Sequence, residues 1–197
     1  SFLAPGLIAM SIIQQSFSHS SSSLMIGKIQ GTIIDTLMAP LSSVEVTLAI
    51  ILAAITRSII ITVISIIVFS LIVKIHIYSI FYIFIFAFLG SFILGAVGFI
   101  AGLWAEKFDH MATVTNFIIT PLSFLSGVFY SIDRLPSFFQ SISKVNPFFY
   151  MIDGFRFGFL GVSDGSINFG LIYLTILSVA VWLISYYLFK MGYKIKS

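Results

Sequence analysis

Charged residues divide this chain into long apolar runs, and the lengths of these runs predict helices that cross a membrane. Lys, Arg, Asp and Glu are absent from 1–27, 75–105, 110–132 and 165–189, and the run 46–73 contains only Arg57. A bilayer core about 30 Å thick is crossed by about 20 helical residues. Each of these five runs is long enough, so the sequence predicts five membrane spans.

The composition of the runs favours α-helices over strands. Segments such as 59–64 (Ile-Ile-Ile-Thr-Val-Ile) and 81–86 (Phe-Tyr-Ile-Phe-Ile-Phe) are apolar on every face, whereas the strands of a transmembrane barrel alternate apolar and polar side chains. Hydrophobic residues make up 59% of the chain and charged residues 9%, against roughly 45–50% and 25% in soluble domains. The expected fold is an all-α polytopic membrane protein, with 1–197 forming a single transmembrane domain.

Sequence evidence for other kinds of function is weak. The chain has no cysteine, and His19, His76 and His110 are too scattered to suggest a metal site. Nucleotide-binding P-loop, zinc-helix and nucleophile-elbow patterns do not occur. The polar candidates within the spans, Arg57, His19, Asn116 and several serines, include no evident acid–base pair. We therefore expect no catalysis and no bound cofactor, and the net charge of +3 without a basic stripe does not indicate nucleic acid.

The first span is expected from about Phe2 to about Leu24. Its second half, 16–23, is rich in serine and contains His19. Serine hydroxyls can bond to carbonyls one turn earlier, so the helix can continue there if it faces other helices. A serine-rich loop is the alternative. Because the chain begins inside an apolar run without an initiator Met, we expect a truncation within or near a span.

The segment 28–45 is too polar to span a membrane and predicts an amphipathic helix. A helix of about three turns over 28–41 fits its pattern, and Pro40 should end it. Ser42 and Glu45 would then form a capping box for the second span. The helix either docks on a partner or lies on the membrane surface alone. Its apolar residues recur every four positions, at Ile29, Ile33, Leu37 and Leu41.

Two features of the second and third spans have more than one explanation. Arg57 lies near the middle of its span, where a charge costs about 2.5–3.5 kcal/mol to insert, so it should face a cavity, a polar partner or a snorkelling route. On the third span, within 78–105, small residues share one helical face. They predict a close contact within the bundle or with a second copy, or are simply tolerated in membrane helices. These residues are Ala87, Ser91, Gly95, Gly98 and Gly102.

The second half of the chain contains two further spans separated by a long aromatic segment. The charged turn 106–110 precedes the fourth span, 111–130, which should be kinked at Pro121. The segment 131–168 contains six charged residues, two prolines and many aromatic residues. This composition fits interfacial or re-entrant helices packed against the bundle. The last span is expected at about 169–189.

The distribution of basic residues predicts the orientation of the spans. The positive-inside rule favours a cytoplasmic C-terminus, because the last span is followed by Lys190, Lys194 and Lys196. With five spans, the amphipathic helix and the turn 106–110 are then cytoplasmic, and Ser1 and 131–168 lie outside. Four basic residues on the outer side weaken this bias: Lys74, Arg134, Lys144 and Arg156.

Two classes of function remain open on these grounds. The chain is either a transport subunit whose cytoplasmic helix receives force from a separate motor protein, or a stand-alone membrane protein. The second class includes structural or assembly proteins and intramembrane enzymes. The amphipathic helix at 28–41 discriminates between the two classes, because a helix between two spans is a place where a cytosolic partner could push.

Six blocks of sequence, in order along nearly the whole chain, resemble the membrane subunit of type-2 ABC exporters, a group that includes polysaccharide and drug efflux permeases. Each block alone is weakly specific, and together they are specific. The resemblance implies a six-span subunit of the bacterial inner membrane, of which this chain holds the second to sixth spans. The blocks are 2–7 (Phe-Leu-Ala-Pro-Gly-Leu), 31–42 (Gly-Thr-Ile-Ile-Asp through Ala-Pro-Leu-Ser), 102–108 (Gly-Leu-Trp-Ala-Glu-Lys-Phe), 116–122 (Asn-Phe-Ile-Ile-Thr-Pro-Leu), 127–131 (Gly-Val-Phe-Tyr-Ser) and 146–156 (Asn-Pro through Asp-Gly-Phe-Arg).

The resemblance also implies a separate ATPase that binds ATP and Mg²⁺, which explains why this chain has no P-loop. Two permease copies and two ATPase copies, surrounded by membrane lipid, would form the working unit. ATP would close the ATPase dimer and shift the bundle between inward and outward states. The helix at 28–41 would be the coupling helix received by the ATPase, with coupling residues Lys28, Gly31, Asp35 and Pro40.

A substrate path between the two permease copies is implied as well. It would be lined mainly by the first, second and fourth spans of this chain, with Arg57, Asn116 and Phe124 as candidate path residues. The aromatic segment would form a pair of short extracellular re-entrant helices, in which an outer gate is shaped by Asn146, Pro147, Asp153 and Arg156. Such aromatic and aliphatic linings suit lipid-linked glycans, amphipathic drugs and haem-like molecules equally, so the cargo stays open.

Overall fold

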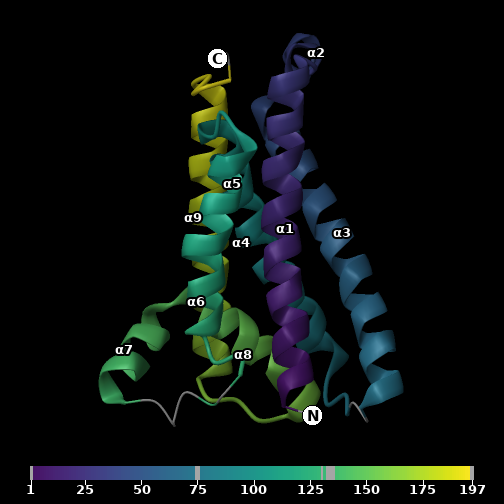
Figure 1. Ribbon diagram of the computed structural model, residues 1–197, viewed down its shortest axis with the longest axis vertical. Helices are drawn as coiled ribbons and strands as arrows, with labels where there is room; N and C mark the ends of the chain where they lie inside the picture. The colour runs from purple at the N-terminus through teal and green to yellow at the C-terminus, as the bar shows by residue number, and fades with distance from the viewer. Residues whose placement is uncertain (1, 74–75, 130, 132–135, 196–197) are drawn as a thin grey trace.

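The computed structural model describes residues 2–73, 76–129, 131 and 136–195, and of 137 and 139 it describes the backbone only. These residues form helices and no strands (Figure 1), which confirms the expected all-α fold. One segment, η1, is π-helical. The elements are α1 (Leu3–Gln30), α2 (Ile33–Met38), α3 (Ser43–Ile72), α4 (Ile80–Trp104), α5 (Phe108–Val114), η1 (Thr115–Ile119), α6 (Thr120–Phe124), α7 (Ser137–Val145), α8 (Pro147–Leu160) and α9 (Ile167–Lys190).

The long helices run side by side along the longest axis of the molecule (Figure 1). α2, the turn between α4 and α5, and the C-terminus lie at one end, which we call the α2 end. α7, α8 and the N-terminus lie at the other, the α8 end. α1 packs along α4 and α3, and in Figure 1 it lies between α3 and the rod formed by α5, η1 and α6.

Three of the described helices are long and apolar enough to cross a membrane, namely α3, α4 and α9. They match the spans predicted at 46–73, 78–105 and 169–189. α1 has 28 residues, but its serine-rich half makes it more polar, and the α5–η1–α6 rod is divided into short segments. The five-span prediction is therefore confirmed for three helices and stays a prediction for α1 and for the α5–η1–α6 rod.

α1 continues as a helix through its serine-rich half, which excludes the loop alternative. The Ser21 hydroxyl donates to the Phe17 carbonyl at 2.8 Å, the one-turn back-bond that lets serine remain in a helix. Ser16, Ser20 and Ser21 are buried inside the bundle. This half of α1 is consequently held by neighbouring helices and does not face lipid on that side.

The glycines of α4 lie directly against the backbone of α1. A Cβ built on Gly98 would meet the Phe17 carbonyl oxygen at 2.5 Å, and one built on Gly102 would meet the Ser21 carbonyl oxygen at 2.9 Å. Any side chain at these positions would push the two helices apart. Here the small-residue face forms a close contact within the bundle, the arrangement expected where no hydrophobic force acts between membrane helices.

The same face of α4 also contacts α3. The Ser91 and Ser58 hydroxyl oxygens are 2.6 Å apart in the buried α3–α4 contact. A Cβ on Gly95 would lie 3.5 Å from the Ala54 and Ile51 side chains, an ordinary van der Waals distance. α4 is therefore the central helix, with α1 and α3 packed on its small residues.

The main apolar core joins α1, α4 and α8 at the α8 end. Phe149, Phe155 and Phe159 of α8 are almost fully buried. Gly154 lies directly against the Phe86 ring of α4, so no side chain would fit there. α8 is thus an internal helix, packed into the bundle and not resting on its surface.

The fourth predicted span differs from a simple kinked helix. Its described helical part ends at Phe124, and a π-helical stretch, Thr115–Ile119, precedes Pro121. Proline has no N–H to donate to the carbonyl four residues earlier, and the extra residue of the π segment accommodates this missing bond. Tyr130, the predicted end of the span, lies outside the described residues.

The single amphipathic helix predicted over 28–41 is wrong, because the structure divides this segment. α1 continues to Gln30, Gly31 adopts a left-handed conformation with φ of 75°, and α2 has only six residues. Left-handed backbone ends a helix and suits glycine, which carries no Cβ. The predicted stop before Pro40 is confirmed, since α2 ends at Met38, as is the capping box between Ser42 and Glu45.

Candidate functional site

The α2 end carries a short helix with exposed apolar side chains. Ile33 is buried and holds α2 to the bundle. Met38 is 81% exposed, and Ile34, Leu37 and Leu41 are also exposed. Large apolar side chains grouped outside the membrane-spanning helices are typical of a surface that contacts a partner or the membrane interface.

Lys28 fastens α1 to the end of α4. Its ammonium donates to the Leu103 and Ala105 carbonyls, both at 2.8 Å, and to the Gly102 carbonyl at 3.5 Å. The last carbonyls of a helix have no partner within the helix, so this side chain caps α4 from outside. The structure places Lys28 in α1, facing the bundle and not on α2.

The other three predicted coupling residues surround α2. Gly31 forms the left-handed turn before it, with open space around its Cα. Asp35 is exposed in its first turn, and the Asp35 carbonyl accepts the Ala39 N–H at 3.0 Å. Pro40 is exposed and follows Ala39, whose backbone is extended. These positions shape the segment and leave the Asp35 side chain on its outer surface.

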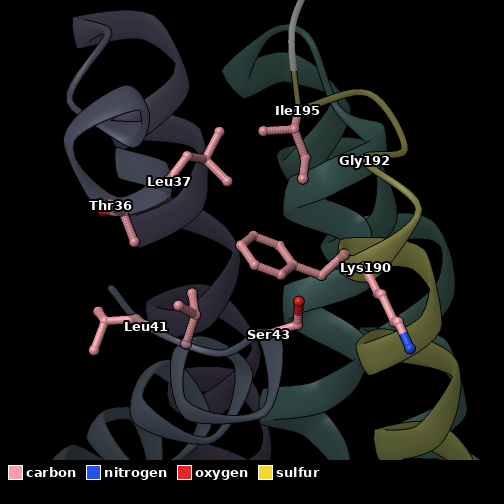
Figure 2. Close-up of a pocket in the computed structure, with 9 residues that line it drawn as sticks. Thr36, Leu37, Leu41, Ser43, Lys190, Gly192 and Ile195 are labelled. Atoms are coloured by element: carbon pink, nitrogen blue, oxygen red, sulfur yellow. The ribbon is translucent and has the colours of Figure 1, made fainter. Parts of the chain in front are cut away.

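A cavity of about 550 Å³ lies between α2 and the end of α9. Figure 2 shows Leu37 and Leu41 on one side of it, Lys190 and Ile195 on the other, and Ser43 between Leu41 and Lys190. Its lining comes from both the first and the second half of the chain.

An ion pair closes the same end of the molecule. Lys194 donates to the Glu106 carboxylate at 3.0 Å, which ties the C-terminal segment to the turn between α4 and α5. The hydrogen bond and charge of Lys194 lower the pKa of Glu106 below its ordinary value of 4.5. Both side chains are largely exposed, so the pair is weak and sensitive to salt.

α1 exposes a stripe of polar side chains. We call it the α1 stripe, and it consists of Ser11, Gln14, Gln15, Ser18 and Ser22. These residues are exposed or half-buried. By contrast, most of the exposed side chains in the second half of α3, such as Ile60, Ile64 and Ile67, are apolar, as lipid contact requires. Exposed polar residues at membrane depth normally face protein or a water-filled cavity, so the α1 stripe differs in character from the apolar exposed side of α3.

Arg57 of α3 and His19 of α1 meet beside this stripe. The Arg57 Nη1 atom is 3.1 Å from His19 Nδ1. Of the three explanations that the sequence left open for Arg57, the structure therefore provides a polar partner.

The remaining two path candidates lie on the opposite side of α1, in the α5–η1–α6 rod. Asn116 is exposed on η1. Phe124, at the end of α6, is 43% exposed and its ring centroid lies 5.5 Å from that of Phe129. The structure therefore places Arg57 and Asn116 on elements that flank the α1 stripe and does not bring them into contact.

Asn146 and Pro147 mark the junction of α7 and α8 at the α8 end. The Asn146 side chain caps α8 by accepting the Phe148 N–H at 3.1 Å. Its amide donates to the Leu122 carbonyl at 3.0 Å and to the Ser126 hydroxyl at 2.8 Å. Asn146 thus fastens the start of α8 to the end of α6. Asn146 and Pro147 also line an apolar cavity of about 550 Å³ beside α7.

Asp153 and Arg156 form a buried ion pair within α8, 2.9 Å apart and each no more than 2% exposed. Arg156 also donates to the Gly127 carbonyl at 3.0 Å and to Asp164 at 3.3 Å. The Asp153 carboxylate accepts the backbone N–H groups of Asp164 and Gly165, each at 3.0 Å. The pair therefore joins α8 to the loop that follows it and to the turn after α6.

Sequence reasoning missed three of these contacts, and only one left a local signal. His19 stands out as a histidine in a run that lacks charges, but nothing near it indicates Arg57, which lies 38 residues away. The bonds from Lys28 to α4 and from Arg156 to Gly127 join positions far apart in the sequence. Among the described residues, no group of three or more His, Asp or Glu side chains could hold a metal ion.

Comparison with known proteins agrees with this architecture. A family model described as ABC-2 type transporter matches residues 1–160. The chain belongs to this family. It is 32% identical over 198 residues to the inner membrane transport permease YadH of Escherichia coli K12, a match that covers 100% of this chain and 77% of the relative.

A shorter match extends to nodulation protein J of Rhizobium leguminosarum bv. viciae, which is 30% identical over 90 residues. That match covers 46% of this chain and 35% of the relative. The apolar helices and the family membership together make this chain a multi-pass protein of the bacterial inner membrane, the permease subunit of an ABC transporter. The blocks quoted from its sequence therefore identified the family correctly.

Proposed function

We propose that this permease is the membrane subunit of an ATP-driven exporter, working as a pair of copies on a pair of separate ATPase subunits. In this proposal α1 and the α5–η1–α6 rod are spans alongside α3, α4 and α9. The α2 end is cytoplasmic and the α8 end extracellular. ATP and Mg²⁺ bind to the ATPase and not to this chain.

The main support for this proposal is the exposed apolar surface of α2. Ile34, Leu37 and Met38 project from a six-residue helix that joins two long helices, α1 and α3. The helix before it, α1, is bonded to the end of α4 through Lys28, and the helix after it, α3, begins at the Ser42–Glu45 capping box. A force applied to such a helix is transmitted directly to the bundle, as coupling to a cytosolic ATPase requires.

The α1 stripe supports the pairing of two copies. In a single copy, these polar side chains and Arg57 are open on the outside of the bundle. Lipid does not solvate such groups, so a second copy facing this side would cover them and enclose a polar path. Asn116 borders the same surface from η1 and would line the path as well.

The α8 end supports an outer gate. α7 and α8 are joined to the end of α6 through Asn146 and through the Ser143 hydroxyl, which donates to the Leu125 carbonyl at 2.9 Å. Their backbone and side chains satisfy the irregular turn after α6, which is the condition for re-entrant structure at membrane depth. Phe124, at the end of that rod, would close the path beneath this gate.

The test is co-purification of the full-length permease with the ATPase encoded beside its gene, with Met38→Glu compared against Met191→Glu. Both residues are exposed methionines at the α2 end, but only Met38 lies on α2. Burying an unpaired carboxylate in an interface should weaken ATPase association about tenfold or more, with a matching fall in ATP turnover. Met191→Glu should change neither.

Two results would contradict the proposal. If neither variant changes association, α2 does not contact the ATPase. If the unmodified permease binds no ATPase at all, the alternative of a stand-alone structural, assembly or enzymatic membrane protein takes its place.

A further inference from the structure

We propose that Arg57 and His19 form a binding site for the anionic headgroup of an amphipathic cargo. The inference rests on the proposed function, because it assigns a substrate class to the path beside the α1 stripe. The recognised chemistry is a phosphate-like or carboxylate-like group of oxygen acceptors attached to an apolar tail.

The first observation is that the pair offers hydrogen-bond donors and no acceptor. A guanidinium group has five N–H donors and accepts nothing, so the contact at 3.1 Å requires His19 Nδ1 to be the acceptor. The neutral imidazole ring then carries its proton on Nε2, which is a donor. After the two residues have bonded to each other, every polar hydrogen that remains on the pair is available to an acceptor.

The second observation is that no described carboxylate neutralises Arg57. None of the described acidic residues lies outside the two ends of the bundle. Asp153 and Asp164 bond to Arg156 at the α8 end, and Glu106 bonds to Lys194 at the α2 end. An uncompensated guanidinium at membrane depth is costly. A ligand with anionic oxygens would supply the missing charge through strong, charge-assisted hydrogen bonds.

The third observation is the depth of the pair. Arg57 lies 14 residues from the start of the 30-residue α3, or about 21 Å along the helix, and thus near the bilayer centre. On α1, Gln15 and Ser22 lie one turn on either side of His19 and extend the polar surface. Beyond Arg57, towards the α8 end, most of the side chains that α3 exposes are apolar, such as Ile60 and Ile64, and Ser70 is the polar exception near the end of the helix. A polar head at the pair with a tail along α3 fits this division.

The test is a binding titration of the full-length permease in phosphatidylcholine nanodiscs, using three probes. Dioctanoyl phosphatidic acid supplies an anionic head and a tail, dioctanoyl phosphatidylcholine the tail with a neutral head, and inorganic phosphate the anion alone. We expect phosphatidic acid to bind most tightly. Arg57→Gln should weaken its binding about tenfold or more, since a hydrogen-bonded charge is lost.

His19→Glu provides a second variant that does not depend on removing the Arg57 charge. Its carboxylate would pair with Arg57, satisfy the guanidinium and block anion binding to a similar degree while leaving the fold intact. Lys190→Gln is the control, because it removes a cation from the α2 end without touching the pair; binding should stay within about twofold.

Three results would overturn the inference. Phosphatidylcholine binding as tightly as phosphatidic acid would exclude recognition of the head, and inorganic phosphate binding as tightly would exclude a need for the tail. Equal losses in Lys190→Gln and in Arg57→Gln would place the anion at the membrane surface. Because ATPase association is measured separately, an unmodified permease that binds its ATPase but not phosphatidic acid would refute the substrate class alone.

Discussion

At the scale of single residues, a close backbone contact between α1 and α4 depends on the absence of one side chain. Gly98 allows α4 to approach the Phe17 backbone of α1, where a Cβ would be only 2.5 Å from a carbonyl oxygen. Backbone atoms cannot move aside as a flexible side chain can. The packing of α1, with its polar stripe, therefore depends on glycine at this position.

We predict that Gly98→Ala destabilises the protein, whereas Gly90→Ala on the same helix does not. The Gly98 methyl group would force α1 away from α4, at a cost of about 1–3 kcal/mol. At Gly90 the nearest atoms belong to Met151 at 3.7 Å, so alanine fits there and gains up to about 1 kcal/mol of helix propensity. Thermal unfolding in detergent measures both; equal stability of the two variants would contradict the assignment.

Residue-scale features were predictable from the sequence only where they are local. The capping box needs Ser42 and Glu45 three residues apart, and it is present as expected. The partner of Arg57 is 38 residues away on another helix, and no periodicity in either segment specifies that the two side chains meet. Contacts between residues close in the sequence could be predicted, and contacts between residues far apart in the sequence could not.

At the scale of elements, the end of α4 is completed by a group from another part of the chain. The Lys28 ammonium of α1 donates to the Gly102 and Leu103 carbonyls of α4 and to the Ala105 carbonyl directly after it. α1 itself ends at Gly31, and α3 begins at its own capping box. The contact between Lys28 and α4 is thus the direct polar link between the helix before α2 and the central helix.

We predict that Lys28→Met destabilises the bundle by about 1–3 kcal/mol, because carbonyls at the end of α4 lose a charged donor. Lys28→Arg should retain most of the stability. Lys190→Met is the matched control: Lys190 is an exposed lysine at the same end whose Nζ lies 5.6 Å from the Tyr186 ring, and its loss should change stability by less than about 0.5 kcal/mol. Thermal unfolding compares the three variants, and a loss in the control as large as in Lys28→Met would refute the capping role.

Element boundaries were predictable where hydrophobicity alone decides them. α3, α4 and α9 follow from uninterrupted apolar runs. The helix expected over 28–41 failed because the left-handed turn at Gly31 overrides a regular four-residue pattern. The π segment before Pro121 was missed for a similar reason, since its apolar residues have the same composition as an ordinary helix.

At the scale of the whole molecule, an exposed ion pair joins two distant parts of the second half of the chain at the α2 end. Lys194 and Glu106 form the described ion pair between the C-terminal segment and the turn before α5. The lowered pKa of Glu106 means that its ionised form is favoured in the folded state. Its contribution is complete above the ordinary value of 4.5 and is lost as the pH falls through the lower folded value.

We predict a small, salt-dependent loss of this contribution on acidification. At low ionic strength and neutral pH, Glu106→Gln should melt slightly below the unmodified protein, and the difference should vanish as the pH falls through the lowered pKa of Glu106. At about 1 M salt the difference should be absent at neutral pH as well, because exposed charges are screened. Melting curves over pH at two salt concentrations test this, and a difference that grows on acidification would show the opposite sign.

The bonds from Lys28 to α4 have a mechanical consequence. The Lys28 ammonium, near the end of α1, donates to three carbonyls at the end of α4 and so holds the two helix ends together as one unit. If the proposed ATPase pushes on α2, α1 should then not tilt alone, because the end of α4 and the turn leading into α5 would move with it. The pivot of such a stroke would lie further along the bundle, beyond the glycine contact at Gly98.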